Sequence, residues 1–281
     1  MQKRFSFIVL QIVFFIGLSL LLYPPVSNCW NSFHQTRAIA QYSGEVASLK
    51  LADYKALWSD AQAYNASLPG RSNQFLLSEA QKEEYSRLLN LSGLGIMGYI
   101  DIPAINCRLP IYHGTEESVL QIAVGHLEWS SLPVGGESTH CVLSGHRGLP
   151  SARLFTDLDQ LKEGDIFILR VLDEELRYCV DQILTVVPQE TEALRIAPGE
   201  DYCTLVTCTP YGINTHRLLV RGHRVSGTGQ TEALPISADA EKIRPLTAAA
   251  MAATPILLLS IISLLAGKLK RKRRGDQHEE A

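Results

Sequence analysis

The stretch "LVTCTPYGINTHR", residues 205–217, places a cysteine at the end of an apolar run and an arginine nine positions later. Side chains alternate between the two faces of a strand, so Cys208 shares a face with Val206. The turn-forming residues between Cys208 and Arg217 predict a hairpin with a long loop, which would bring these two side chains together. The spacing alone leaves Cys208 as a buried hydrophobe, half of a disulfide or a nucleophile. It leaves Arg217 as the partner of the cysteine or as a solvated charge at a strand end.

Further strand-like runs surround this hairpin and predict one β domain. Each is short and rich in β-branched and large apolar residues, and the connections are irregular, which is typical of a β-barrel or sandwich. Proline is expected to interrupt the first run at Pro103 and Pro110. Residues 117–127 and 151–161 are expected to form short helices or turns. The runs are residues 97–112, 140–146, 165–172, 176–187, 202–208 and 216–225.

The residues before this domain show helical spacing. A stripe of apolar residues three and four positions apart predicts an amphipathic helix over about residues 30–66. Ser78 stands three residues before Gln81 in the arrangement of a capping box, which predicts a second helix over residues 78–89. The first stripe consists of Ile39, Tyr42, Val46, Leu49 and Leu57.

Two apolar segments flank these regions. Residues 5–25 follow a short basic flank and supply about twenty nearly uncharged residues, enough to cross a bilayer as a helix. A cleaved secretory signal is the alternative, but its apolar region is shorter and a small-residue cleavage site is missing here. The second segment, residues 246–267, precedes six basic residues within 268–274. Because basic flanks stay in the cytoplasm, both termini are expected in the cytoplasm, and residues 26–245 are expected on the outer side of the membrane.

The expected organisation follows from these patterns. It comprises a membrane anchor (1–25), a helical region (26–92), a β domain (93–226), a polar linker (227–245), a second membrane helix (246–267) and a basic cytoplasmic tail (268–281). The net charge of −3 and the 20% charged residues do not suggest a nucleic-acid binder.

The chain has six cysteines, and their spacing forms neither a C-x-x-C motif nor a zinc-binding pattern. An even number outside the membrane is compatible with disulfides. Four of them lie in short strand-like runs, where buried core thiols are the simpler interpretation. These four are Cys107, Cys141, Cys179 and Cys203.

A cysteine nucleophile usually needs a histidine within reach. Of the eight histidines, His146 has the most suitable context, because it ends an apolar strand directly before a Gly- and Pro-containing loop. Cys208 has a matching position, so two strand ends that open on one rim would bring the residues together across 62 positions. In such a site the thiolate attacks a carbonyl, His146 protonates the leaving amine, and Arg217 stabilises the oxyanion.

Four stretches resemble class C sortases, the pilin-polymerising enzymes of Gram-positive bacteria. They are "TLVTCTPYGINTHRLLVRGHR" (204–224), "SGHRGLPSARLFTDLDQLKEGD" (144–165), "GYIDIPAINCRLPIYHGT" (98–115) and "GHLEWSSLPVGG" (125–136). The similarity covers residues 93–225, and the two flanking apolar segments are also typical of that family.

The resemblance implies an eight-stranded sortase β-barrel that carries a helical appendage. Cys208 would attack the Thr–Gly bond of an LPxTG-like sorting signal and form a thioester, with His146 as general acid and base and Arg217 holding the substrate and oxyanion. The partners would be pilin or surface-protein substrates and an acceptor pilin lysine. The resemblance implies neither a metal nor an organic cofactor. The loop between the strands at 176–187 and 202–208 would help to form the groove for the sorting signal.

One feature departs from the family pattern. Many class C sortases carry a lid with an Asp-Pro-aromatic motif, and this chain has no Asp-Pro dipeptide. The stretch "RSNQF" (71–75) lies in the corresponding region, so Phe75 is a candidate for the apolar plug. Ordinary packing of Phe75 against the barrel is the competing interpretation.

Other functions stay open at this stage. A housekeeping-type sortase would attach surface proteins to cell-wall precursor instead of polymerising pilins. A hydrolytic cysteine peptidase would use the same residues with water as acceptor. An inactive, membrane-tethered binding module would need none of them.

Overall fold

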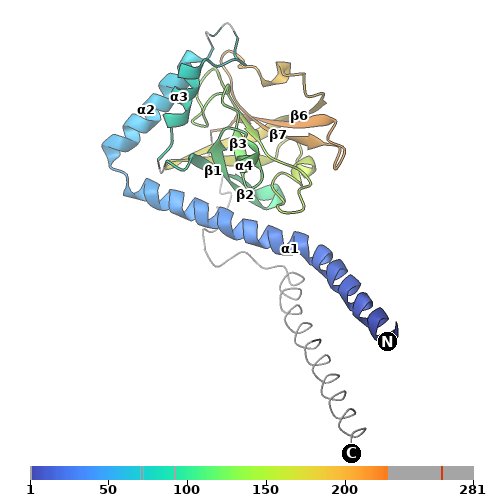
Figure 1. Cartoon of the computed structure of the whole chain (residues 1–281). Helices are drawn as coiled ribbons and strands as arrows, with labels where there is room; N and C mark the ends of the chain where they lie inside the picture. Colours follow the sequence, from blue (N-terminus) through green and yellow to red (C-terminus); the bar gives the residue numbers. More distant parts are fainter. Residues whose placement is uncertain (1, 70, 72, 92, 227–260, 262–281) are drawn as a thin grey trace, which may run out of the picture. The chain divides into compact units, whose positions relative to one another are not determined.

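The computed structural model describes residues 2–69, 71, 73–91, 93–226 and 261 of the chain. Residues Ser27–Ala238 form one compact unit, and its described part contains the sheet and the helices that cover it (Figure 1). The residues before it continue the first helix and form part of a second unit.

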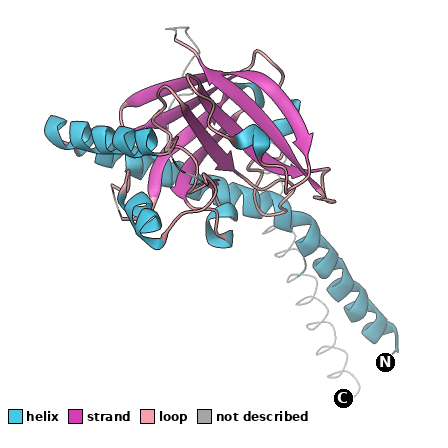
Figure 2. Ribbon diagram, turned by 90° about the horizontal axis from the view of Figure 1, so that it is seen from above, coloured by secondary structure: helices cyan, strands magenta, loops and turns pink. Residues whose placement is uncertain are grey.

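Eight strands close into a barrel in the order β1-β2-β3-β4-β7-β8-β6-β5, and Figure 2 shows them curling around one another. Neighbours run antiparallel except for the pairs β2–β3 and β4–β7, which are parallel. The eight-stranded barrel expected from the sequence is therefore present. The strands are β1 (Ile96–Ile102), β2 (Cys107–His113), β3 (Val124–His126), β4 (Thr139–Ser144), β5 (Ile166–Val171), β6 (Glu174–Val186), β7 (Asp201–Thr209) and β8 (His216–Arg224).

Alternate residues of these strands fill the barrel with a close-packed apolar core. On β7 the inward side chains are Cys203 and Leu205, and both have no exposed surface. Phe155, Phe167 and Tyr178 are also fully buried, and rings of this size supply much of the apolar area that burial removes from water. The period-two pattern recognised in the sequence is thus the pattern of core burial.

Two details of the strand prediction were wrong. Pro110 lies inside β2 and does not end it. β3 pairs only with Ile111–His113 of β2, so Pro110 lies just before the residues that pair with β3. A proline is tolerated at such a position, because its missing N–H is not needed for pairing with β3. The three-residue strand β3 lies within residues 117–127, for which only helices or turns were expected. The preceding residues form the short helix α4 (Glu117–Leu120). Short 3-10 turns occupy Pro103–Ile105, Leu158–Gln160 and Glu192–Leu194.

The N-terminal helices differ in their limits from the sequence prediction. α1 runs without interruption from Gln2 to Ser48 and passes through Pro24 and Pro25. A separate helix, α2 (Leu51–Ser67), follows after Lys50 takes an extended conformation. The single helix expected over about 30–66 is therefore two helices, and its stripe residues Ile39 and Tyr42 are buried against the barrel.

Side-chain hydrogen bonds attach this helical region to the barrel. The amide of Asn65 on α2 both donates to and accepts from the backbone of Leu132, at 3.0 and 2.7 Å. Tyr85 on α3 (Glu79–Arg87) places its hydroxyl 3.0 Å from His126 Nδ1 and accepts from the Gly114 amide. The capping box predicted at Ser78 is present at the start of α3. Because these polar groups are buried and paired, the helices are held in a fixed position.

One helix among the described residues is long and apolar enough to cross a membrane, and it lies near the N-terminus. Its exposed apolar residues include Ile12, Phe14 and Leu21. The second membrane helix predicted at 246–267 and the basic tail lie outside the described residues, apart from position 261.

All six cysteines are free thiols, which agrees with the expectation of unpaired core cysteines. Cys107, Cys141 and Cys203 are buried, while Cys179 is half-buried on β6. Burial raises the pKa of the Cys107 thiol to about 12, so this group is inert at neutral pH.

Candidate functional site

Cys208 and Arg217 lie directly opposite each other on adjacent antiparallel strands. The register of β7 and β8 pairs Cys208 with Arg217 and Thr209 with His216. The intervening loop carries Asn214 in the left-handed backbone region, a conformation that asparagine tolerates in turns. The hairpin predicted from the sequence is therefore present, and it sets the cysteine beside the arginine.

His146 reaches the same place from the other side of β7. β4 runs parallel to β7, and its last residue, Ser144, pairs with Val206. The pairing extends one step further, because the Gly145 amide donates to the Val206 carbonyl at 3.0 Å and the Thr207 hydroxyl donates to the Gly145 carbonyl at 2.7 Å. Two residues beyond Ser144 and Val206, the same register places His146 level with Cys208.

The glycine before the histidine has a steric reason. A Cβ atom at Gly145 would lie 2.7 Å from the ring of Phe155, which is fully buried. The His146 carbonyl accepts a hydrogen bond from the Phe155 amide at 3.1 Å, so this ring and the loop backbone are fixed together. The S-G-H sequence thus lets the chain turn tightly over the core where β4 ends.

The three residues lie on the outer face of the barrel. On β7 the inward positions are Cys203 and Leu205, so Val206 and Cys208 point outward. Leu219 on β8 belongs to the same outer group, and Arg217 stands two residues before it. We call this group the outer apolar strip. It consists of Val142, Leu194, Val206 and Leu219, with Leu127, Trp129, Leu184, Val186 and Ala193 packed on it.

His146 is partly open to solvent. Its side chain is 26% exposed, and Nε2 lies 3.5 Å from a carboxylate oxygen of Glu117 on α4. By contrast, His113 and His126 hydrogen-bond to backbone carbonyls inside the fold. His140 does the same with the carbonyl of Arg195. These three histidines are structural, which agrees with the general expectation for a histidine on a packed face.

Arg217 is held by its own loop. Its Nη1 atom donates to the carbonyls of Asn214 and His216 at 3.2 and 3.1 Å. No carboxylate among the described residues forms an ion pair with it at 4.0 Å or less. A guanidinium has five N–H donors, so these two bonds leave donors for an anionic or carbonyl ligand.

Phe75 lies over the outer apolar strip. Its ring meets Trp129 edge to face, with 4.9 Å between centroids, and the guanidinium of Arg195 stands 5.4 Å from its ring centre. The neighbouring Gln74 side chain hydrogen-bonds to the backbone of Leu194 and Ile196 at 3.3 and 3.2 Å. The stretch 73–75 is thus attached to the loop between β6 and β7. The sequence showed neither the Trp129 and Arg195 contacts nor Glu117 beside His146, because each joins loops that are distant in the chain.

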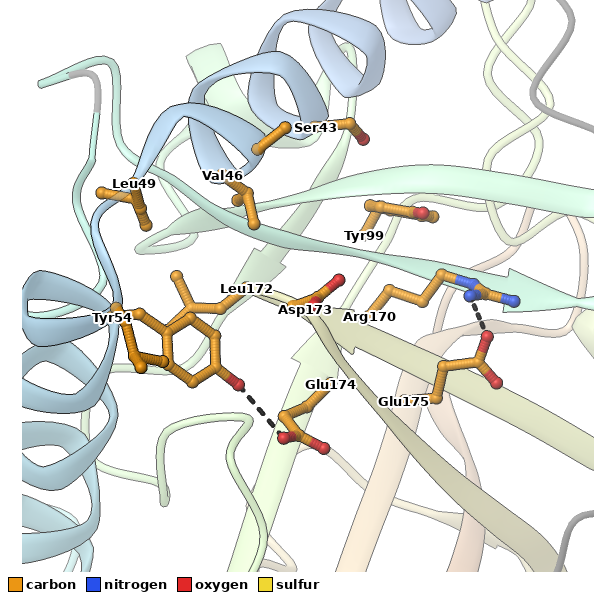
Figure 3. A pocket seen from close by; sticks show the side chains of 12 residues that line it. Ser43, Val46, Leu49, Tyr54, Tyr99, Arg170, Leu172, Asp173, Glu174 and Glu175 are labelled. Carbon is orange, nitrogen blue, oxygen red and sulfur yellow. Dashed lines mark hydrogen bonds and ion pairs between the residues drawn. The ribbon is translucent and has the colours of Figure 1, made fainter.

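A separate cleft of about 650 Å³ lies between the end of α1, the start of α2 and the turn from β5 to β6. Figure 3 shows Tyr54 directed at Glu174, with a hydrogen bond of 3.1 Å, and Arg170 directed at Glu175. Glu174 begins β6, whereas Val186 at its far end pairs with Arg217, so about 40 Å of strand separate the cleft from Cys208. No cluster of three His, Cys, Asp or Glu side chains in the described part of the chain could hold a metal ion.

Comparison with known proteins agrees with this arrangement. Residues 100–225 match the family model of the sortase domain. The crystal structure of sortase C1 from Streptococcus agalactiae is 52% identical, superposes with a TM-score of 0.67, and the match covers 68% of this chain and 99% of that one. A sortase C of Streptococcus pneumoniae, described in relation to pilin substrate specificity, is 48% identical with a TM-score of 0.63 over 68% and 97% of the two chains. Sortase A of Streptococcus agalactiae is 28% identical over 209 residues, which are 73% of this chain and 78% of that protein.

A match at 52% identity that spans nearly the whole of a solved sortase shows the family as well as the fold. The chain therefore belongs to the sortase family of cysteine transpeptidases, in its class C group.

Proposed function

We propose that this protein polymerises pilins by transferring the acyl group of an LPxTG-like sorting signal to a lysine amine of another pilin subunit. The observation that carries the proposal is the alignment of His146, Cys208 and Arg217 across β4, β7 and β8 on one outer face. The sortase C of Streptococcus pneumoniae, which was described with pilin substrate specificity, supports the choice of substrate class.

In the proposed reaction the Cys208 thiolate attacks the threonine carbonyl of the Thr–Gly bond. The C–N bond then breaks as the His146 imidazolium gives its proton to the leaving glycine amine, and a thioester to Cys208 remains. The acceptor lysine amine attacks this thioester and passes a proton to His146. The Cys208 thiolate leaves, so the enzyme returns to its starting state and an isopeptide bond joins the two subunits.

Arg217 has the geometry for oxyanion and substrate stabilisation. It faces Cys208 in the register, it is always charged at physiological pH, and two of its donor bonds already fix it to the loop. Preorganised donors of this kind contribute more than flexible ones, because they need no rearrangement when charge develops.

The outer apolar strip is the proposed groove for the sorting signal. Its apolar residues suit the leucine and proline of an LPxTG-like motif, and the β6–β7 loop borders it through Ala193 and Leu194. Phe75 covers part of this strip through its contact with Trp129, so we assign residues 73–75 as a lid. Phe75 would have to move away from Trp129 before a peptide enters the groove. This lid lacks the Asp-Pro pair that many class C sortases carry.

The proposed location is the cell membrane, with residues 26–245 outside the cell and both termini in the cytoplasm. The apolar part of α1 supports the first anchor. The second anchor rests on the apolar and basic sequence of 246–274.

The function is tested by incubating the full chain in detergent with a sorting-signal peptide and purified pilins, followed by mass spectrometry. We expect a thioester on Cys208 and then an isopeptide-linked pilin dimer. Transfer to cell-wall precursor in place of pilin would favour the housekeeping reaction of surface-protein anchoring, and release of free acid alone would indicate a peptidase.

A further inference from the structure

We infer that Glu117 is a positioning residue for His146, and this inference rests on the proposed function of that histidine. The carboxylate would accept the proton on Nε2 and so leave Nδ1 as the ring nitrogen that exchanges protons with Cys208 and the amines. Glu117 lies on α4, in the connection between β2 and β3, and His146 lies in the loop after β4. The contact between them therefore joins two separate connections.

The first observation is the state of His146 Nε2. This atom is shielded from solvent, and no hydrogen bond within the described part of the chain satisfies it. A buried imidazole nitrogen without a hydrogen-bond partner destabilises the fold. The His146 side chain as a whole is 26% exposed, so other parts of the ring reach solvent. The nitrogen that points inward is therefore the one that needs a protein partner, and the open edge of the ring is left for the reacting groups.

The second observation is the placement of Glu117. Its Oε2 atom is 3.5 Å from Nε2, and Oε1 accepts a hydrogen bond from the side-chain amide of Gln121 one turn later. The hydrogen bond with Gln121, followed by the charge of His146, lowers the pKa of Glu117, so the carboxylate is ionised at neutral pH. The carboxylate is 69% exposed, which lets a small rotation shorten the contact with the ring when substrate binds.

The chemical consequence has two parts. A carboxylate that accepts from Nε2–H fixes the ring in one tautomer, and this orients Nδ1 for proton transfer. The same negative charge favours the imidazolium, which is the form that must protonate the leaving amine. On the neighbouring elements Cys208 ends β7 and Arg217 begins β8, and Arg147, next to His146 in the chain, forms an ion pair with Asp159. The two arginines have no acceptor atom, and Asp159 is already paired with Arg147.

The test is the pH dependence of kcat/KM for peptide cleavage by the full chain and by the variants Glu117→Gln and Glu117→Ala. Glu117→Gln removes the charge, so kcat/KM should fall about two- to fivefold at pH 8, the range of an exposed ion pair, and the basic limb should move to lower pH. Glu117→Ala also removes the acceptor and should lose more. Glu116→Gln is the matched control, because it neutralises the adjacent exposed carboxylate, and its profile should overlay that of the unmodified protein.

A second readout does not need turnover. In the Cys208→Ala background, 15N NMR of the His146 ring should show mainly the Nε2–H tautomer above neutral pH, and Glu117→Ala should redistribute it. An unchanged tautomer in Glu117→Ala, or a pH profile of Glu117→Gln that overlays the control, would overturn the inference. Absence of turnover in the unmodified protein would instead contradict the proposed function and leave the NMR result to decide the role of Glu117.

Discussion

At the scale of the residue, the site depends on which face of each strand a side chain occupies. Cys203 and Cys208 are five positions apart on β7, so they point to opposite faces, one into the core and one outward. Cys203 has no exposed surface and lies opposite Cys141 inside the barrel. Strand parity alone therefore separates a structural thiol from a candidate nucleophile.

Replacement of Cys208 by alanine should abolish formation of the thioester with an LPxTG-like peptide, because the change removes the proposed sulfur nucleophile. The fold should persist, since Cys208 is half-buried at the end of β7 and outside the main core. Intact-protein mass spectrometry measures the thioester, and thermal unfolding measures the fold. The matched control is Cys179→Ala, a half-buried thiol on β6, which should keep full activity. Pilin ladders formed by the Cys208 variant would contradict the assignment.

Arg217 should respond even to a conservative change. Lysine retains the charge but lacks the planar set of donors, so Arg217→Lys should lower kcat, and Arg217→Ala should lower it by about 10²–10³-fold, as for a lost oxyanion donor. The control is Arg221→Lys, which alters an arginine on the same face of β8 that is paired with Asp181. Steady-state kinetics with a fluorogenic sorting peptide separates kcat from KM. Equal kcat in Arg217→Lys, Arg217→Ala and the unmodified protein would remove this role.

At the scale of the element, buried polar contacts hold the β6–β7 loop beside the groove. His140 on β4 donates from Nδ1 to the Arg195 carbonyl at 2.8 Å, and Nε2 accepts from the Thr204 hydroxyl at 2.7 Å. Both ring nitrogens are thereby satisfied in the neutral form. Protonation of Nε2 would require the Thr204 hydroxyl to turn from donor to acceptor, and it would place a positive charge inside the fold.

This arrangement makes the stability depend on pH. Desolvation by burial lowers the pKa of His140 to about 4, below the ordinary value of 6.5. The unfolded chain therefore takes up a proton between pH 6.5 and 4 that the folded chain does not, so stability falls as pH decreases through this window, by about 3 kcal/mol for this group. Thermal unfolding in detergent at several pH values measures the slope. His140→Asn should flatten the slope but not abolish it, because burial also lowers the pKa of His113; an unchanged slope would contradict this account.

The lid assignment makes a prediction about access. If Phe75 covers part of the groove through Trp129 and Arg195, then Phe75→Ala should increase the rate at which a bulky thiol reagent labels Cys208. Peptide mass spectrometry quantifies the label at each cysteine. The control is Leu76→Ala, since this adjacent side chain is already 70% exposed and covers little. Equal labelling rates in all three proteins would show that Phe75 only packs against the barrel.

Most of the strands could be predicted from the sequence, whereas the features that depend on contacts between distant segments could not. Short runs rich in β-branched and large apolar residues identified seven of the strands, and the strand ends located Cys208 and His146. The sequence did not predict β3, because three residues are too few to show a period. It placed a break at Pro110, because only the pairing partners decide whether a proline is tolerated. Neither Glu117 beside His146 nor Trp129 beside Phe75 could be found, because both contacts arise from packing of separate loops.

At the scale of the whole molecule, closure of the barrel is what assembles the site. β4 and β7 are separated in the sequence by β5 and β6, yet they lie side by side as a parallel pair. Parallel neighbours end at the same edge of the sheet, so the strand ends that carry His146 and Cys208 lie side by side although 62 residues separate the two residues. One apolar segment precedes the barrel in the sequence, at residues 5–25, and another follows it, at residues 246–267.

The proposed two-pass topology predicts that the barrel and the C-terminus lie on opposite sides of the membrane. An epitope attached after Ala281 should be protected from external protease in cells stripped of their wall, because the basic residues of 268–274 hold that end in the cytoplasm. An epitope inserted at the Glu137–Ser138 turn, where Glu137 is exposed, should be cleaved in the same cells, and both epitopes should be cleaved after permeabilisation. Cleavage of the C-terminal epitope in intact cells would leave α1 as the one anchor and would require residues 246–267 to have another role.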